Sequence, residues 1–204
     1  LGKRYRHLNA GNALCYGCGP ILVTRQPVRR ANLAGLRIVL PGEHTTAHLL
    51  FRLYCPEAAH RIFTTYDRIF GEILAGHADC GVVIHESRFL YEKEGLCKVC
   101  DLGQWWEETT RSPVPLGAIA VRRDIPPELD AALEGLIRKS LLLARNDPAL
   151  TRSYVRKMAC KMDAAVIDKH IRAFVNDFTM DIGEQGMRSI EQLKMMASSA
   201  GIVP

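Results

Sequence analysis

Long apolar runs are absent from this 204-residue sequence. No stretch approaches the ~18 apolar residues that a membrane-spanning helix needs, and the opening LGKRYRHLNAGNALC has no apolar block of signal-peptide length. The composition is that of a globular protein, with 48% hydrophobic and 24% charged residues. We therefore expect a cytoplasmic protein with no membrane partner.

Acidic residues are missing from residues 1–40, which carry seven basic residues. The whole chain has 27 Lys+Arg and 22 Asp+Glu, so the remainder sums to 20 − 22 = −2. A basic segment can attract nucleic acid or small anions, but no nucleic-acid-binding motif accompanies this one. We expect a solvated basic edge and no nucleic-acid partner.

Several common catalytic motifs are also absent. The sequence has no GxGxxG after a strand, no phosphate-binding P-loop and no GxSxG nucleophile turn. His44 and His48 are four residues apart, which is a metal-binding spacing on a helix. The intervening sequence HTTAH lacks the glutamate of the HExxH motif. We expect no metal at this pair.

The cysteines suggest a zinc site only superficially. There are seven, and four of them form two CxxC pairs, Cys15/Cys18 and Cys97/Cys100. The pairs are separated by 78 residues, whereas compact zinc ribbons use about 15–20. Cys97 and Cys100 also lie in a predicted strand, where residues three apart face opposite sides. We therefore expect no zinc, and reduced thiols in a chain without a secretion signal.

The order of predicted elements indicates an α/β fold. Short strand-like and helix-like segments alternate through the first half of the chain, which is typical of a mostly parallel sheet covered by helices. The predicted strands are 21–24, 37–40, 61–65, 80–84 and 96–101, and the predicted helices are 45–54 and 66–74. After a further strand at 117–122, the sequence predicts helices at about 128–145, 147–161, 163–178 and 184–198.

Two proline-bearing crossings suggest two lobes. They lie near Pro20 and near Pro113–Pro115, so we expect one lobe over 20–114 and the other from 1–19 with 115–204. The helices of the latter lobe carry apolar faces that need a sheet to cover them, for example Leu133, Leu136, Ile137 and Leu141. The chain provides few strands there. We expect that this first lobe is incomplete, that an N-terminal segment is missing, and that the uncovered face causes self-association.

Two predicted strand ends are candidate site elements, because open parallel sheets bind ligands beyond the carboxyl ends of their strands. PGEHTTA follows the strand at 37–40 and leads into a helix, where backbone N–H groups with Thr45 and Thr46 can hold a carboxylate or phosphate. The alternative is helix capping by one threonine. His85 follows the buried strand at 80–84 and suits general-base chemistry. The alternative there is a structural histidine.

Several strings together resemble one enzyme family. They are PGEHTTAHLLFRLY, YDRI, GHADCGVVIHESRFLYEKEGL, DLGQWWEETTRSPVPLGAIAVRRDI and AFVNDFTMDIGEQG. In this order they are similar to the 1,4-dihydroxy-6-naphthoate synthases of the futalosine route to menaquinone. The resemblance implies a two-lobed α/β fold of the periplasmic-binding-protein type (type II), used as a cytoplasmic lyase.

The same resemblance implies a site and a substrate. The catalytic base would be His85, and the substrate-binding set would be Thr46 and Ala47 beside Thr45, with Ile84. The substrate would be the anionic small molecule cyclic dehypoxanthinyl futalosine, and the chemistry needs no cofactor or metal. The family's opening strand and its serine-containing substrate loop have no match in this sequence. The alternative function is a non-catalytic solute-binding protein for a small carboxylate.

Overall fold

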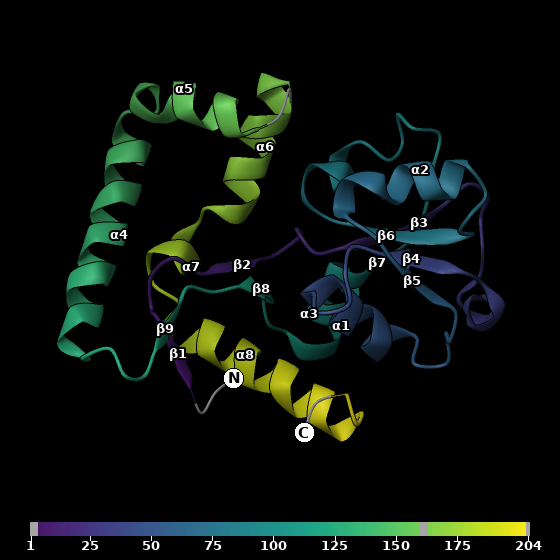
Figure 1. The fold of residues 1–204 in the computed structure, drawn as a ribbon, viewed down its shortest axis with the longest axis horizontal. Coiled ribbons are helices and arrows are strands. Elements are labelled where there is room, and N and C mark those ends of the chain that lie inside the picture. The colour runs from purple at the N-terminus through teal and green to yellow at the C-terminus, as the bar shows by residue number, and fades with distance from the viewer. Residues whose placement is uncertain (1–3, 160–162, 203–204) are drawn as a thin grey trace. The chain divides into compact units, whose positions relative to one another are not determined.

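The computed structural model describes residues 4–159 and 163–202 (Figure 1). The chain divides into two compact units: unit 1 comprises 1–15 with 115–187, and unit 2 comprises 16–114 with 188–204. The sequence-based division grouped 16–19 and 188–204 with the other lobe. The observed and the predicted divisions agree on one boundary, which lies between residues 114 and 115.

A five-stranded sheet forms the centre of unit 2. Its strand order is β5-β4-β6-β3-β7. The sheet is mixed: β4 pairs in parallel with β5 and β6, whereas β3 is antiparallel to both β6 and β7. The expectation of a mostly parallel sheet thus misses the reversal of β3. The strands are β3 (Ile21–Thr24), β4 (Ile38–Leu40), β5 (Arg61–Phe63), β6 (Cys80–Val83) and β7 (Cys97–Asp101).

Helices cover both faces of this sheet (Figure 1). Helix α2 (Ile69–Leu74) packs on one face, and α1 (Thr46–Tyr54) and α3 (Leu102–Thr110) pack on the other. Gly81 of β6 allows the close approach of α2, since a Cβ there would lie 2.7 Å from both Ile69 and Ile73. The core on the α2 side consists of Ile21, Val23, Val39, Ile69, Ile73, Ala78, Val83 and Leu96.

Three short 3-10 helices complete the framework of unit 2: η1 (Arg30–Gly35), η2 (Tyr66–Arg68) and η3 (His85–Phe89). The predicted helix 66–74 is therefore split into η2 followed by α2. The first turn closes through a bond between residues three apart, from the N–H of Arg68 to the carbonyl of Thr65 at 3.0 Å, which is the 3-10 pattern.

The segment that precedes β3 packs closely on α3. A Cβ on Gly19 would lie 2.3 Å from the Cα of Gly103, so this contact requires glycine. Trp106 is fully buried, and its indole Nε1 donates to the carbonyl of Pro113 at 3.0 Å. The same carbonyl accepts from Ser189 Oγ at 2.5 Å.

Unit 1 contains two small sheets and most of the helical part of the chain. β1 (Tyr5–His7) pairs antiparallel with β9 (Ala120–Arg122), and β2 (Ala13–Cys15) pairs with β8 (Val114–Gly117). The predicted strand 117–122 therefore begins at the last residue of β8 and ends with β9, and residues 118 and 119 between them belong to neither strand. The helices are α4 (Glu128–Asn146), α5 (Ala149–Met158), α6 (Ala164–Phe174), α7 (Asp177–Met180) and α8 (Gly183–Ser199), the last extending into unit 2.

The predicted helix 163–178 is interrupted in the structure. Asp163 caps its start, accepting from the N–H of Ala165 at 3.0 Å, as predicted. Asn176 then caps a separate helix, α7, through a capping box with Thr179. The predicted end of the preceding helix, at residue 161, lies outside the described residues.

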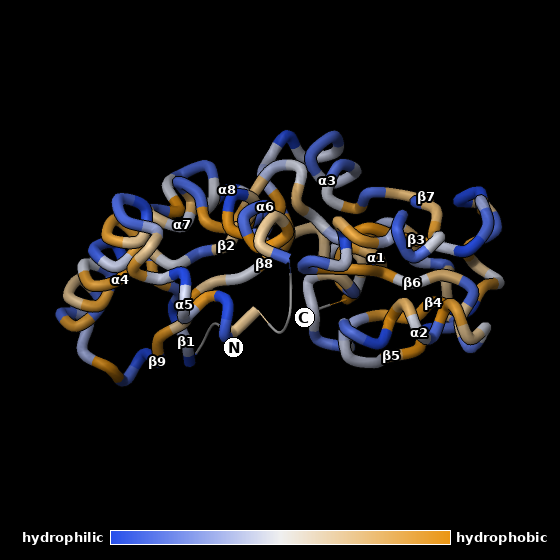
Figure 2. The backbone as a smooth tube through the Cα atoms, turned by 90° about the horizontal axis from the view of Figure 1, so that it is seen from above, coloured by the Kyte–Doolittle hydropathy of each residue, from blue (hydrophilic) through white to orange (hydrophobic). Residues whose placement is uncertain are grey.

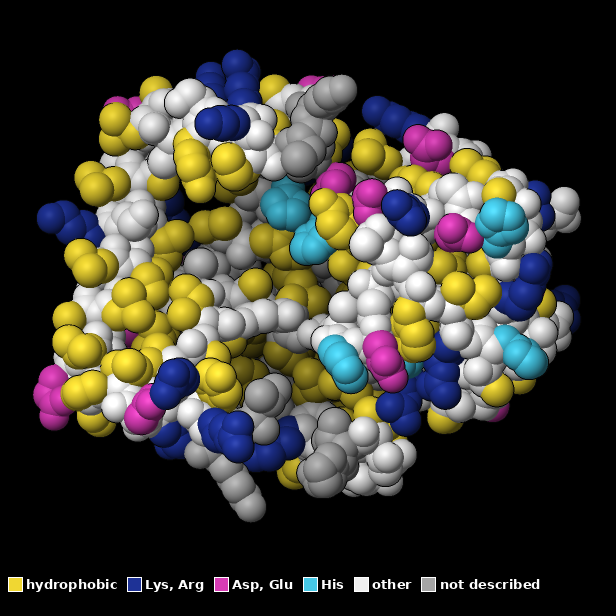
Figure 3. All heavy atoms as spheres, in the orientation of Figure 1, with side chains coloured by type: hydrophobic (Ala, Val, Ile, Leu, Met, Phe, Trp, Pro, Cys, Tyr) yellow, Lys and Arg dark blue, Asp and Glu magenta, His cyan; other side chains and the backbone are white. Residues whose placement is uncertain are grey.

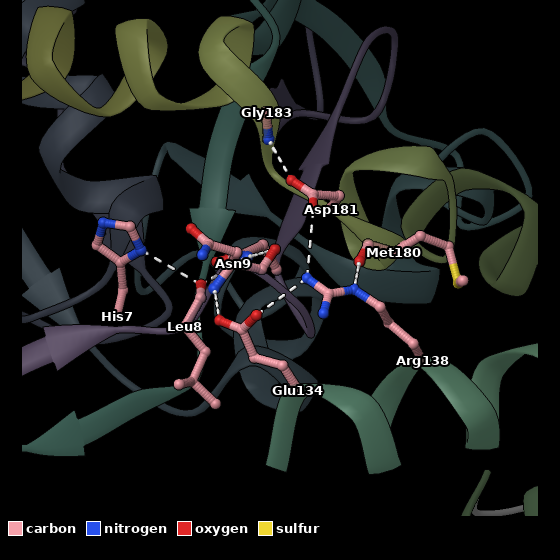
Figure 4. A network of polar contacts seen from close by, with 9 residues as sticks. His7, Leu8, Asn9, Glu134, Arg138, Met180, Asp181 and Gly183 are labelled. Atoms are coloured by element: carbon pink, nitrogen blue, oxygen red, sulfur yellow. Dashed lines mark hydrogen bonds and ion pairs between the residues drawn. The ribbon is translucent and has the colours of Figure 1, made fainter. Parts of the chain in front are cut away.

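A buried carboxylate holds the N-terminal segment of unit 1 (Figure 4). Glu134 of α4 accepts from the backbone N–H of Asn9 at 2.7 Å and from Arg138 at 3.0 Å. Arg138 also donates to the carbonyl of Met180 at 3.0 Å and to Asp181 at 3.2 Å. Glu134 and Arg138 together therefore connect α4 to the turn after β1 and to the segment between α7 and α8.

Helix α4 has an uncovered apolar face. Figure 2 shows hydrophobic residues recurring along α4, and Figure 3 shows hydrophobic side chains at the surface over α4 and α5. Leu136 is 65% exposed and Leu143 is 52% exposed. The hollow beside them is lined by Leu136, Lys139, Ser140, Leu143, Ala144, Leu150 and Thr151. In the described part of the chain, no helix is both long and apolar enough to cross a membrane.

Candidate active site

One edge of the unit 2 sheet gathers the candidate residues. Ile38 of β4 is paired with Cys80 of β6, and also with Arg61 of β5. Since adjacent parallel strands end at the same edge, the segments that follow β4, β5 and β6 emerge together. These are residues 41–45, 64–66 and 84–85. They include the start of α1, Tyr66 of η2 and His85 of η3.

Thr45 is the N-cap of α1. Its hydroxyl accepts from the N–H of His48 at 3.2 Å and donates to the carbonyl of Gly42 at 2.9 Å. The Thr45 hydroxyl therefore caps the helix, which was the alternative to anion binding for this residue. Thr46 is the first helical residue and is half-buried, and Ala47 is buried. The first N–H groups of a helix have no intrahelical acceptor, so this turn presents a positive dipole end to an anion.

His48 is the most buried titratable group of α1. Its Nδ1 lies 2.7 Å from the carbonyl oxygen of Glu43, and its ring makes an edge contact with Phe63 at 4.9 Å between centroids. Burial lowers the pKa of His48, which favours the neutral imidazole. His44 lies in the turn before the N-cap and is exposed, so the two histidines do not form a metal-binding pair on one helix.

His85 begins η3 in an unusual backbone conformation. Its φ is +53°, a left-handed value that is uncommon for a residue with a Cβ and is often found at functional sites. Ile84 before it is extended and half-buried. The side chain of His85 is exposed at the strand edge.

Tyr66 is a site residue that sequence reasoning missed. Its ring meets the His85 ring edge-on, with centroids 5.1 Å apart and an interplanar angle of 71°. The periodicity of residues 66–74 assigned Tyr66 to the apolar face of a helix, but 40% of it is exposed. The available signal is its position directly after the predicted strand 61–65, which matches the position of His85 directly after the predicted strand 80–84.

The cysteines correct two sequence-based arguments. Thr24 pairs with Cys97 and Leu22 pairs with Cys100, with a bulge between. Thr24 and Leu22 are two apart on one strand, so Cys97 and Cys100 share a face, and the expectation of opposite faces is wrong. Among the described residues there is no group of three metal-capable side chains.

The oxidation state also differs in part from the expectation. Cys15 and Cys18 are disulfide-bonded, as the CxxC spacing permits, and so are not reduced thiols. Free thiols are found at Cys55, Cys80, Cys97 and Cys100. Cys160 lies outside the described residues.

Comparisons with known proteins agree on one family. A family model described as menaquinone biosynthesis matches residues 1–199. A 1,4-dihydroxy-6-naphthoate synthase of Thermus thermophilus is 41% identical over 199 residues, which cover 98% of this chain and 72% of that protein. The enzyme of the same name from Streptomyces coelicolor is 40% identical over 202 residues, covering 97% of this chain and 71% of that protein.

Solved structures agree on the fold. Protein AF1704 from Archaeoglobus fulgidus superposes with a TM-score of 0.93 and 32% identity, over 100% of this chain and 75% of that one. An alkanesulfonate-binding protein from Xanthomonas axonopodis, bound to MOPS, gives a TM-score of 0.64 at 11% identity, over 100% of this chain and 71% of that one. The fold is thus periplasmic-binding-protein-like, and the chain belongs to the menaquinone-biosynthesis family that includes the 1,4-dihydroxy-6-naphthoate synthases.

Proposed function

We propose that this chain carries the general base of a lyase that converts cyclic dehypoxanthinyl futalosine to 1,4-dihydroxy-6-naphthoate. The observation that supports this most is the parallel register of β4 and β6, which brings the start of α1 and His85 to one edge of the sheet. The names and the identities of the two relatives support the same reaction.

The chemistry requires a base and an anion site. A neutral imidazole at His85 takes a proton from a substrate carbon. The electron pair left behind forms a new double bond in the ring as the carbon–carbon bond to the sugar-derived portion breaks. The pair of that bond leaves with the sugar-derived portion, which takes up a proton. The product ring becomes aromatic, so the reaction as written is redox-neutral and uses no metal. The N–H groups at Thr46 and Ala47, together with the Thr46 hydroxyl, hold the substrate carboxylate. Thr45 caps the helix that presents them, and Ile84 lines the same edge.

The other candidate is a protein that binds a small carboxylate without turning it over. The likeness to an alkanesulfonate-binding protein favours it, because one fold serves both roles. The position of His85 at the strand edge favours the enzyme. We also propose that the protein acts in the cytoplasm.

The test is replacement of His85 by asparagine, which keeps a polar side chain but removes the base. Turnover of cyclic dehypoxanthinyl futalosine should fall by roughly 10²–10⁴, the usual contribution of a positioned base, while substrate affinity stays within about threefold. His77→Asn, at an exposed histidine of the same unit, is the matched control and should leave turnover unchanged.

Two results would reject the proposal. One is undiminished turnover in His85→Asn. The other is a wild-type protein that binds the substrate but forms no naphthoate, which would favour the solute-binding function.

A further inference from the structure

Arg88 is a buried cation that the proposed mechanism does not use. It lies in η3, three residues after His85, and only 8% of it is exposed. Burying a guanidinium is costly unless its charge and its N–H groups find partners. The partners that it does find indicate what it holds in place.

The Arg88 guanidinium donates hydrogen bonds to two segments outside η3. Nη1 donates to the carbonyl of Gly17 at 2.5 Å, and Nη2 donates to Asp101 Oδ2 at 3.3 Å. Asp101 in turn caps α3 with its other oxygen, which accepts from the N–H groups of Gly103 and Gln104 at 2.9 and 3.0 Å. The N–H of Gly17 donates to Glu107 of α3 at 2.7 Å.

These partners lie at the edge that carries His85. Asp101 ends β7, and Ile21 at the start of β3 pairs with both Asp101 and Val83. Through these two contacts, Arg88 connects η3 to the segment before β3 and to the end of β7. This matters because the left-handed φ of His85 is strained and persists only where surrounding contacts impose it.

We propose that Arg88 is a positioning residue, which fixes η3 so that the His85 imidazole is held against Tyr66 and aimed at the substrate edge. This inference rests on the proposed role of His85. A misplaced base lowers the chemical step more than it lowers binding, so the effect of losing Arg88 should appear in kcat rather than in KM.

The test uses Arg88→Met and two companion variants. For Arg88→Met we expect kcat to fall at least about tenfold with KM within about threefold. We also expect loss of the nuclear Overhauser contact between the Tyr66 and His85 rings. Arg88→Lys keeps the charge but can reach one partner at a time, so it should recover part of kcat and part of the ring contact.

Stability must be separated from positioning. Arg88→Met leaves the half-buried Asp101 carboxylate without its cation, which by itself lowers the melting temperature. The double variant Arg88→Met with Asp101→Asn removes that charge. It should regain melting temperature but not kcat or the ring contact. Arg37→Met, which breaks the exposed Arg37–Asp79 pair, is the control that should leave the ring contact unchanged.

The outcomes are distinct. If the double variant, or Arg88→Met itself, retains wild-type kcat and the ring contact, Arg88 has only a structural role and the inference is wrong. If the wild-type protein shows no turnover, the proposed reaction fails. The ring contact in the same variants still decides whether Arg88 positions His85.

Discussion

Thr45 and Thr46 hold different positions at the start of α1. Thr45 is engaged in capping α1 through His48 and Gly42, whereas Thr46 begins the helix at the proposed anion site. We predict that Thr46→Val weakens substrate binding by about tenfold, the loss of one hydrogen bond to a charged group. The melting temperature should change little.

The control for this prediction is Thr45→Val. It removes an N-cap, which costs about 1 kcal/mol of stability, so its main effect should be on the melting temperature. Isothermal titration and thermal unfolding of both variants measure the two effects. Unchanged substrate affinity in Thr46→Val would contradict an anion-binding role for Thr46.

The pKa of His48 predicts a dependence of stability on pH. Because burial lowers this pKa in the folded chain, the unfolded chain binds more protons below its ordinary value of about 6.5. The free energy of unfolding should therefore decrease as the pH falls below about 6.5, and level off below the folded pKa. His48→Asn retains a donor for the carbonyl of Glu43 and should flatten the curve between pH 7 and pH 5.

Urea unfolding at several pH values measures this effect. His77→Asn, at an exposed histidine, provides the comparison and should keep the wild-type slope. An unchanged slope in His48→Asn would show that other groups cause the acid sensitivity.

At the level of secondary structure, two helical glycines should respond in opposite directions. Gly103 opens α3 against Gly19, and a Cβ there would lie 2.6 Å from the Gly19 Cα. Gly103→Ala therefore pushes backbone against backbone, and we predict destabilisation by about 1–3 kcal/mol, as in overpacked cores. Gly135 in α4 has open space around it, so Gly135→Ala should stabilise the chain by about 0.5–1 kcal/mol.

Denaturant unfolding of the two variants tests the pair directly. A neutral Gly103→Ala would mean that the segment before β3 can move away from α3 without cost. A destabilising Gly135→Ala would mean that α4 meets a neighbour at this position.

Most of these elements could be predicted from sequence pattern, because each has a local cause. The apolar run at Cys80–Val83 is a strand buried on both faces, and Asp163 caps α6 as its type and position suggest. The features that sequence pattern does not predict depend on contacts between distant segments. The reversal of β3 depends on how it pairs with β6 and β7, and the bulge in β7 on its pairing with β3. The hydrophobic periodicity of the sequence indicates neither the direction of β3 nor the bulge in β7.

The candidate site divides in the same way. Strand ends and a helix start are visible in sequence, so His85 and the turn before α1 were accessible. The contact between Tyr66 and His85 joins two strand ends that are distant in the chain. Arg88 was hidden for another reason: a single arginine in HESRF gives no sign that it is buried.

For the chain as a whole, the uncovered face of α4 and α5 predicts self-association. Exposed apolar patches of this kind are usually interaction surfaces, and Leu136 and Leu143 line the hollow there. We predict that light scattering gives a mass above the 22.8 kDa of one chain. The substitution Leu136→Lys should shift the mass toward the monomer.

The control is Leu74→Lys, which changes an exposed leucine of α2 in unit 2. It should leave the mass unchanged. A monodisperse, active monomer of the wild-type chain would show that the apolar face of α4 needs no cover.

The carbonyl of Pro113 has a consequence for how the chain is made. It accepts from Trp106, seven residues earlier, and from Ser189, 76 residues later. The Ser112 hydroxyl likewise donates a hydrogen bond to Gln192 Oε1. A growing chain on the ribosome exposes residues 16–114 long before these partners are synthesised. The hydrogen bonds of Ser112 and Pro113 with α8 therefore form only near the end of translation. A stop codon before residue 189 removes both of them.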